Sequence, residues 1–215
     1  RQMRKKHDIL MDGDKPAGGR WNFDVENRRR YDGRFPIPKP KLFRNDVSKL
    51  HNMIDKAGVK TFGLIKPKSL IWPINRSQSL ALLKAFLKDG LKEFGTYQDS
   101  MTTASWSLFH ARISFALNTK MLHPLEVIEA AMRAWEKNKR SIKIQQIEGF
   151  VRQILGWREY MRGIYWTMMP KLGRMNFFNH RAALPDYYWT AETKMKCMQA
   201  AIGQSLEHAY AHHIQ

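Results

Sequence analysis

Apolar residues spaced three and four positions apart predict helices through most of the chain. One such run predicts a helix that begins at Ser77 and ends near Gly90 or Gly95. Pro124 favours the first turn of another helix, over residues 124–137, because the N–H that proline lacks has no helical partner there. Further helices are predicted over residues 46–57, ending at Gly58, over residues 141–160, with a bend at Gly156, and from about Glu192 to the end.

Strand signals are absent from most of the sequence. No alternation of apolar and polar residues typical of a strand occurs after residue 20, and no internal repeat is present. Residues 12–44 contain glycines and then Pro36, Pro38 and Pro40 at alternate positions, which favour an extended backbone. The pattern therefore predicts a mainly helical protein in which residues 12–44 form a long linker between domains.

The most informative polar stretch covers residues 96–124. Its small hydroxyl residues predict the start of a helix, on which Ser107, His110 and Ser114 would share one face. Because unpaired N–H groups at a helix start attract anions, one interpretation is a cradle for a phosphorylated ligand. The other is an amphipathic core helix with a Ser/Thr cap, and these residues by themselves favour the second.

The charge balance indicates a polyanionic partner. The 215 residues include 37 Lys and Arg against 19 Asp and Glu, which gives a net charge of +18 and a pI near 10.2. Such a surplus points first to nucleic acid and second to an acidic membrane surface. Arg28, Arg29 and Arg30 stand close to Trp21 and suit phosphate contacts, although a solvated charge run is an equal alternative.

The remaining composition limits the class of protein. An apolar content of 43% can fill a core, so extensive disorder is not expected. Cys197 is the single cysteine, which excludes an internal disulfide and favours a reducing, cytoplasmic setting. No run of 18 apolar residues is present, so no membrane-spanning helix is expected, and we expect a nucleic-acid partner and not a membrane. The first residue is not Met, and we expect a piece of a longer protein that exposes apolar surface when taken alone.

Two groups of residues near the end of the chain are candidates for metal binding or proton transfer. His208 and His212, four residues apart, could share a helix face, and with His213 they could bind zinc, donate a proton or be structural. Cys197 follows Lys194 and Lys196, which favour its thiolate, yet an isolated cysteine is usually a small buried residue. A metal cluster there would need ligands from outside the chain.

Taken in order, six stretches resemble the FAD domain of photolyases and cryptochromes. The resemblance is greatest to the iron–sulfur bacterial branch, which includes prokaryotic (6-4) photolyases. The stretches are Gly18–Asp24, Phe94–Asp99, Ile113–Pro124, Gly156–Tyr160, Lys194–Cys197 and Ala209–Gln215. The resemblance implies that residues 1–44 are the end of an antenna domain with an interdomain loop. Residues 45–215 would then be a helical FAD-binding domain, incomplete at its C-terminus.

The resemblance also implies site residues. Those that would contact FAD are Tyr97, Ser105, Ser107, His110, Arg112, Ser114 and Arg158. Two positions depart from the usual phosphate motif, which has Thr where this chain has His110 and Pro where it has Phe115. The residues expected to contact damaged DNA are Arg28, Arg29, Arg30, Gln153 and Trp157.

The chemistry implied by the resemblance is light-driven repair of UV-damaged DNA. Reduced FAD excited by blue light would give an electron to a flipped-out (6-4) lesion, and His213, paired with His212, would protonate it. Cys197 would be one of four ligands of a [4Fe–4S] cluster, and Trp189 an electron-transfer residue. An antenna pigment would lie in the domain outside this chain. We expect a bacterial, cytoplasmic monomer; the alternatives are a cryptochrome without repair activity and a cofactor-free basic nucleic-acid-binding module.

Overall fold

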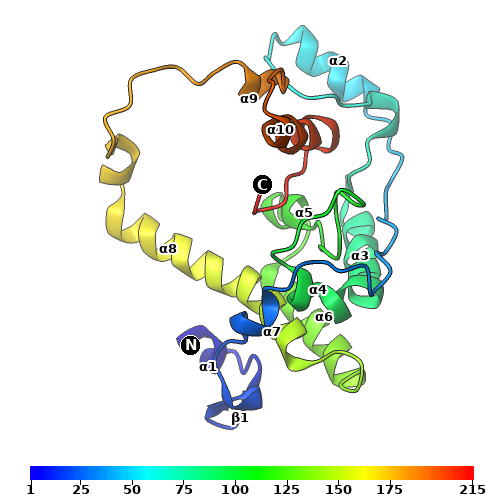
Figure 1. The fold of residues 1–215 in the computed structure, drawn as a ribbon, viewed down its shortest axis with the longest axis vertical. Helices are drawn as coiled ribbons and strands as arrows, with labels where there is room; N and C mark the ends of the chain where they lie inside the picture. The colour runs from blue at the N-terminus through cyan, green and yellow to red at the C-terminus, as the bar shows by residue number, and fades with distance from the viewer. The chain divides into compact units, whose positions relative to one another are not determined.

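The computed structural model describes residues 1–215 and is mainly helical, which confirms the predicted fold class (Figure 1). The chain divides into two compact units. Unit 1 comprises Arg1–Lys39 and Asn75–Met175, and unit 2 comprises Pro40–Ile74 and Asn176–Gln215. No helix is long and apolar enough to span a membrane.

Unit 1 holds most of the helices and a small sheet. The sheet pairs β1 (Met11–Asp12) with β2 (Lys15–Pro16) in antiparallel register. The longer helices are α3 (Arg76–Ala85), α4 (Leu91–Tyr97), α6 (Pro124–Lys137), α7 (Ile144–Val151) and α8 (Trp157–Met168). The shorter helical segments are α1 (Gln2–Lys6), α5 (Ser114–Asn118), η1 (Ala17–Gly19), η2 (Asp24–Asn27), η4 (Phe86–Gly90), η5 (Arg152–Gly156) and η6 (Lys171–Arg174).

Unit 2 is built from α2 (Ser48–Lys56), η3 (Pro67–Ser69), α9 (Tyr187–Thr190) and α10 (Lys196–His208). Its two chain segments are joined by hydrogen bonds to the end of α10. The Trp72 indole donates to the carbonyl of His208 at 2.7 Å, and the backbone N–H of Leu64 donates to the carbonyl of Leu206, also at 2.7 Å. Gly63 permits this approach, because a Cβ there would lie 3.1 Å from the Leu206 oxygen.

The helix predicted over residues 124–137 is confirmed in α6. His123 accepts a hydrogen bond from the N–H of Leu125 at 3.3 Å, and Glu126 accepts one from the N–H of His123 at 3.3 Å. This reciprocal cap and the proline at the first position fix where the helix begins. One face of α6 then packs against the core through Val127, Ile128 and Ala131.

The core of unit 1 lies where α4 crosses α7. Phe94 of α4 packs edge to face on Phe150 of α7, with ring centroids 5.4 Å apart, and Phe86 lies 4.7 Å from Phe150. The helix from Ser77 was predicted to end near Gly90 or Gly95, but the helical backbone continues through both to Tyr97. Gly95 serves close packing instead, because a Cβ there would lie 2.4 Å from the carbonyl oxygen of Gln145.

The prediction of a helix that starts at Ser141 is wrong by three residues. The Ser141 hydroxyl donates to the carbonyl of Asn138 at 3.2 Å and so takes part in a turn, and α7 begins at Ile144. The irregularity predicted at Gly156 falls in η5, a π-helical segment that connects α7 to α8. The helix therefore continues past Tyr160 to Met168.

The prediction of a helix across residues 96–124 is wrong. Residues 99–113, which we call the polar loop, contain no helix, and only Ser114–Asn118 form one turn. Leu108 and Arg112 have positive φ angles of 42° and 54°, which a right-handed helix cannot accommodate. Ser107, His110 and Ser114 therefore do not share a helix face.

The final helix is shorter than predicted. It begins at Lys196 instead of Glu192 and ends at His208, because Ala209 has a left-handed φ of 50°. His212 follows the end of α10, so it cannot share a helix face with His208, as the four-residue spacing suggested.

Candidate functional site

The polar loop is ordered by its own side chains. The Ser105 hydroxyl oxygen accepts hydrogen bonds from the N–H groups of Ser107 and Leu108, at 3.2 and 3.0 Å. These bonds give the backbone an alternative to a helix, and Ser107 and Leu108 become buried. Ser114, which the resemblance assigns to the same group, is exposed at the start of α5.

His110 is held at both ring nitrogens. Nδ1 lies 3.2 Å from the carbonyl oxygen of Ser107, and Nε2 lies 3.0 Å from that of Gln98. Through these two contacts the ring ties the polar loop to Gln98 at the C-terminal end of α4.

Arg112 brings a cation to the polar loop. Its guanidinium carbon lies 5.3 Å from the centroid of the Trp106 ring, and the residue is only 8% exposed. A buried guanidinium retains its charge and can donate to phosphate oxygens in a fixed geometry. Arg112 thus makes the polar loop suitable for an anionic ligand.

Tyr97 closes the start of the polar loop with an aromatic cluster. Its ring stacks on Phe109 with centroids 5.5 Å apart and meets Tyr31 edge to face at 5.5 Å. The Tyr97 hydroxyl donates to Asp32 Oδ1 at 3.0 Å. Burial, more than this bond, raises the pKa of Tyr97. The predicted flavin-binding tyrosine is therefore a well-anchored neighbour of the polar loop.

A group of side-chain amides lies beside the crossing of α4 and α7. Gln153 Nε2 donates to Gln98 Oε1 at 3.3 Å, and Asn27 Nδ2 donates to the carbonyl of Gln145 at 3.2 Å. Gly149 leaves room for this group, since a Cβ there would lie 2.8 Å from Asn27 Nδ2 and 3.1 Å from Gln98 Oε1. Gln98, missed by the sequence reasoning, connects predicted residues Gln153 and His110.

The other residues predicted on this helix have different settings. Trp157 is 59% exposed and contacts Tyr160 edge to face at 5.7 Å. Arg158 is half-buried; its Nη1 donates to the carbonyl of Ile154 at 3.3 Å, and burial lowers its pKa. Trp157 is thus accessible to a ligand, whereas Arg158 is partly enclosed by its own helix.

The predicted arginine segment, Arg28–Arg30, is fastened to unit 1 at several points. Before it, Asn27 is completely buried. Within it, the Arg29 N–H donates to the carbonyl of Thr96 at 3.2 Å, and after it the Tyr31 N–H donates to the Ser100 hydroxyl at 2.7 Å. The predicted linker is therefore packed around these residues.

The three arginines differ in their partners. Arg28 forms an ion pair with Asp24, four residues earlier. Arg29 and Arg30 are exposed, and the ion pairs of the structure include neither of them. Arg29 and Arg30 are therefore the more available cations for a phosphate group.

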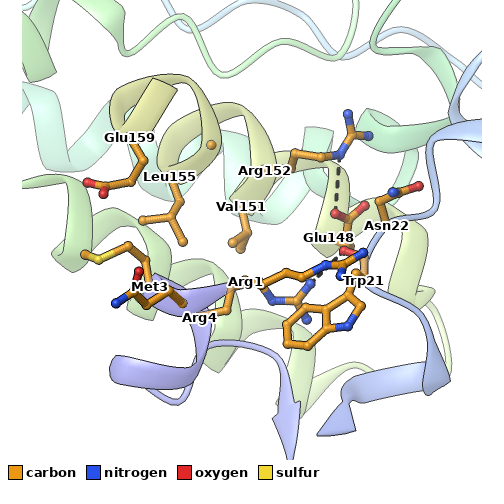
Figure 2. Close-up of a pocket in the computed structure, with 12 residues that line it drawn as sticks. Arg1, Met3, Arg4, Trp21, Asn22, Glu148, Val151, Arg152, Leu155 and Glu159 are labelled. Atoms are coloured by element: carbon orange, nitrogen blue, oxygen red, sulfur yellow. Dashed lines mark hydrogen bonds and ion pairs between the residues drawn. The ribbon is translucent and has the colours of Figure 1, made fainter. Parts of the chain in front are cut away.

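A pocket of about 430 Å³ lies between α1 and the segment from α7 to α8 (Figure 2). Its wall includes Glu148, which is buried, accepts from the N–H of Phe23 at 3.1 Å and pairs with Arg152 at 3.3 Å. Burial raises the pKa of the Glu148 carboxyl, whereas Arg152 lowers it. Sequence reasoning missed this pair, although its four-residue helical spacing is a recognisable signal.

Arg4 forms another wall of the pocket. Its guanidinium donates to the carbonyls of Ile9 at 3.0 Å, Trp21 at 2.9 Å and Leu10 at 2.6 Å. Figure 2 shows Arg4 near the Trp21 ring, whose centroid is 5.3 Å from its guanidinium carbon. Because its donors are directed at main-chain carbonyls, Arg4 joins α1 to the backbone of residues 9, 10 and 21 by hydrogen bonds.

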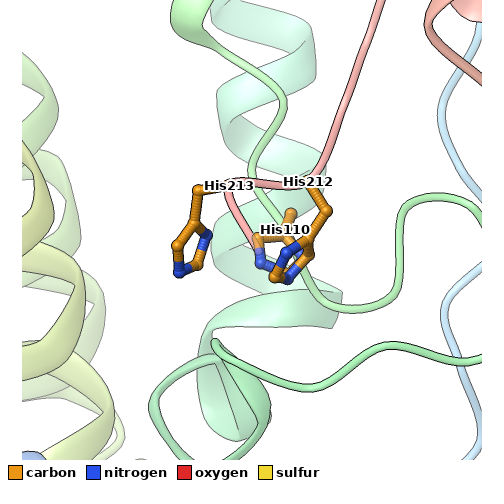
Figure 3. Close-up of side chains that lie close together, drawn as sticks. All are labelled: His110, His212 and His213. Carbon is orange, nitrogen blue, oxygen red and sulfur yellow. The ribbon is translucent and has the colours of Figure 1, made fainter. Parts of the chain in front are cut away.

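In unit 2, the adjacent histidines are stacked. The rings of His212 and His213 have centroids 4.6 Å apart with an interplanar angle of 20° (Figure 3). His212 is buried, and its Nδ1 accepts from the N–H of Ile214 at 3.0 Å, whereas His213 is exposed. His213 is thus the more accessible of the two as a proton donor.

Two further predicted residues of unit 2 are exposed. Cys197 stands in the first turn of α10 with a free thiol. Trp189 of α9 is 48% exposed and meets Phe62 edge to face, with ring centroids 5.2 Å apart. Cys197 supplies a single thiolate, so these residues alone do not make a cluster site.

Comparison with known proteins supports the resemblance. Residues 1–70 match the family model described as deoxyribodipyrimidine photo-lyase-related protein. The chain is 40% identical over 217 residues to a (6-4) photolyase of Agrobacterium fabrum, covering 100% of this chain and 42% of that protein. An uncharacterized protein of Acanthamoeba polyphaga mimivirus is 25% identical over 112 residues, which are 52% of this chain and 84% of that protein. These similarities confirm the predicted resemblance: along its whole length the chain is similar to a (6-4) photolyase.

Proposed function

We propose that this photolyase-related chain forms the flavin-binding and lesion-binding part of a light-driven (6-4) DNA photolyase. The observation that carries the proposal is the 40% identity to a (6-4) photolyase along the whole chain. Because the chain spans 42% of that protein, the activity belongs to a longer molecule. In it, residues 1–44 would end an antenna domain that carries a pigment, and residues 45–215 would belong to the helical domain.

The polar loop and its neighbours suit a bound FAD. Its diphosphate would accept hydrogen bonds from Arg112, and His110 would lie beside it with both ring nitrogens held by main-chain carbonyls. Ser105, Ser107 and Ser114 would add hydroxyl donors, with Tyr97 and Arg158 next to the cofactor. When bound, FAD would supply the electron that blue light releases toward the lesion. The chain's own task is to hold the diphosphate and keep the site enclosed.

Damaged DNA would be held by exposed residues of unit 1. Arg29 and Arg30 are free of ion pairs and would bind phosphates, whereas Arg28 would first have to leave Asp24. Trp157 offers an exposed ring for a flipped-out base, and Gln153 offers a side-chain amide held by Gln98. UV-damaged DNA is therefore the proposed partner.

The proposed proton donor is His213. Its exposed ring stacks on His212, whose own Nδ1 is occupied by the N–H of Ile214. This arrangement orients His213 while leaving it able to transfer a proton to a bound lesion. His212 would act as its support.

A [4Fe–4S] cluster would need three thiolates from outside the 215 residues, because Cys197 is the sole cysteine. Its exposed position at the start of α10 leaves the thiol accessible to such a cluster. Trp189, on the surface of the same unit, would serve as an aromatic step for electron transfer to the flavin.

The test uses the full-length reduced protein and a duplex that contains one (6-4) lesion. Illumination should restore intact thymines, measured by chromatography of the digested DNA. His213→Ala should lower the repair rate about 100-fold or more, as loss of a general acid does, and keep the flavin. His180→Ala, which removes another exposed histidine, should repair normally.

Each contrary outcome has its own meaning. Flavin without recovery of thymines would indicate a cryptochrome without repair activity. A colourless purified protein would indicate a cofactor-free nucleic-acid-binding module. Loss of flavin from His213→Ala would show that His213 is structural.

A further inference from the structure

A second group of cations lies in unit 1, apart from the arginine segment. Residues 137–143, which we call the basic turn, connect α6 to α7 and contain no acidic residue. Four of these seven residues are cationic, and all four are exposed: Lys137, Lys139, Arg140 and Lys143. The basic turn therefore presents a concentrated positive charge to solvent.

Its backbone is fixed by local hydrogen bonds. The side-chain amide of Asn138 donates to the carbonyl of Ala134 at 2.8 Å. The carbonyl of Asn138 accepts from the N–H groups of Ser141 and Ile142, both at 2.9 Å. Ile142 is 5% exposed and anchors the turn to the core. The cations thus project from an ordered support, which reduces the entropy lost when they bind a partner.

None of the four cations forms an ion pair within the chain, although Lys143 is close enough to Glu93 to oppose the rise that burial causes in the pKa of that carboxyl. The ion pairs of the structure include none of them, in contrast to Arg28 with Asp24. Lys139 lies over the Trp135 ring, 4.8 Å from its centroid, which holds the side chain without cancelling its charge. The basic turn consequently retains its charge for an external anion.

The basic turn and the arginine segment flank the same end of α7. Asn27, next to Arg28, donates to the carbonyl of Gln145 in the first turn of this helix. Lys143 is the residue immediately before that helix. Because Asn27 and Lys143 both adjoin the first turn of α7, the two basic segments are neighbours on unit 1.

We infer that the basic turn binds the sugar–phosphate backbone of duplex DNA next to the segment held by Arg29 and Arg30. Four unpaired cations suit a regularly charged polymer, and such contacts do not depend on base sequence. A lipid surface fits less well, because membrane-binding segments also insert apolar residues and the only one here, Ile142, is buried. This inference concerns binding of any duplex and does not require repair.

The test compares the full-length protein with the variant K137Q/K139Q/R140Q/K143Q in the dark. Binding of undamaged duplex DNA is measured by fluorescence anisotropy over a range of salt concentrations. Each lost phosphate contact should reduce the slope of log K against log salt by about 0.9, so the slope should fall by about 3 to 4. The two plots should converge near 1 M, so affinity at about 100 mM salt, one decade lower, should fall about 1,000-fold or more.

The matched control removes four other exposed cations of unit 1, in the variant K5Q/K6Q/K84Q/K88Q. Its slope should change by less than about one unit, because only net charge is altered. An unchanged slope in the basic-turn variant, or an equal loss in the control, would overturn the inference. So would an unchanged DNA affinity accompanied by lost binding to vesicles of anionic lipid. A protein that fails to repair lesions but shows the expected change in slope would refute the proposed function alone.

Discussion

The polar loop and α8 both carry candidate site residues, but they hold them in opposite ways. The polar loop contains no regular secondary structure, yet Leu108, Phe109 and Ile113 are each at most 5% exposed. Helix α8 is regular over twelve residues, yet Trp157 is 59% and Trp166 75% exposed. Regular backbone hydrogen bonding and firm tertiary anchoring are therefore separate properties of this chain.

The difference follows from where the polar groups find partners. A helix satisfies its backbone groups internally, so α8 can extend into solvent without leaving them unpaired. The polar loop has no such ladder and relies on Ser105, on the ring of His110 and on packing around Phe109. Substitutions in the polar loop should therefore reduce stability, whereas those on α8 should mainly alter ligand binding.

The largest expected effect is that of Phe109→Ala. Phe109 is 2% exposed and packs on Tyr97 and Tyr31. Loss of a buried aromatic side chain leaves a cavity and should lower the free energy of unfolding by about 3 to 5 kcal/mol. Urea denaturation of the full-length protein, followed by circular dichroism, measures this change.

The matched substitution on α8 is Trp157→Ala, which should cost less than about 1 kcal/mol, because the ring is already largely solvated. Its effect should appear instead as weaker binding of lesion DNA. An equal loss of stability in both variants would contradict the comparison and indicate that α8 is covered in the complete protein.

An intermediate effect is expected from Gly149→Ala at the crossing of α4 and α7. The new Cβ would meet Asn27 Nδ2 at 2.8 Å and Gln98 Oε1 at 3.1 Å, and both side chains are buried. Overpacking of this kind should cost about 1 to 3 kcal/mol, measured by the same denaturation. Gly163 of α8 has no atom within 4 Å of the corresponding Cβ position.

Gly163→Ala should therefore stabilise the protein by about 0.5 to 1 kcal/mol through helix propensity. If Gly149→Ala were also stabilising, the side-chain amides of Asn27 and Gln98 would have to move aside. That result would contradict the contrast between the tightly packed crossing of α4 and α7 and the exposed α8.

The sequence was sufficient to predict those helices of unit 1 whose boundaries are encoded locally. Helix α6 has the predicted boundaries because its start is encoded locally, by Pro124 and by the His123 and Glu126 cap. The motif that contains Trp157 was likewise placed correctly on a helix. Such signals lie within a few residues of the feature they determine, so a single sequence reveals them.

The polar loop could not be predicted in the same way. Its left-handed residues, Leu108 and Arg112, are types that rarely adopt positive φ. No local sequence signal therefore predicts that the backbone leaves the helical conformation there. Its partners, such as Gln98 for His110, come from other segments. The buried Glu148 was missed because its partner N–H belongs to Phe23, 125 residues earlier. Motif order could nevertheless reveal the resemblance that the comparisons support, since it does not depend on these contacts.

The smallest expected effect is that of Tyr97→Phe, which removes one hydrogen bond and leaves the ring in place. The N–H of Arg34, and then the Tyr97 hydroxyl, hold the pKa of Asp32 below its ordinary value. A carboxylate whose pKa is lower in the folded than in the unfolded state contributes stability above its unfolded pKa. That contribution is lost as the pH falls through the lowered folded value. Tyr97→Phe should therefore lower stability at neutral pH, several times less than Phe109→Ala, and the difference should diminish below pH ~4.

Denaturation of both proteins between pH 7 and pH 3 measures this convergence. Tyr160→Phe on α8, where the tyrosine is 58% exposed, should match the wild type at every pH. A difference between Tyr97→Phe and the wild type that stayed constant down to pH 3 would show that the hydroxyl acts through packing. In that case the Tyr97 contact with Asp32 would not support the polar loop, whose anchoring would rest on Ser105, His110 and the aromatic cluster.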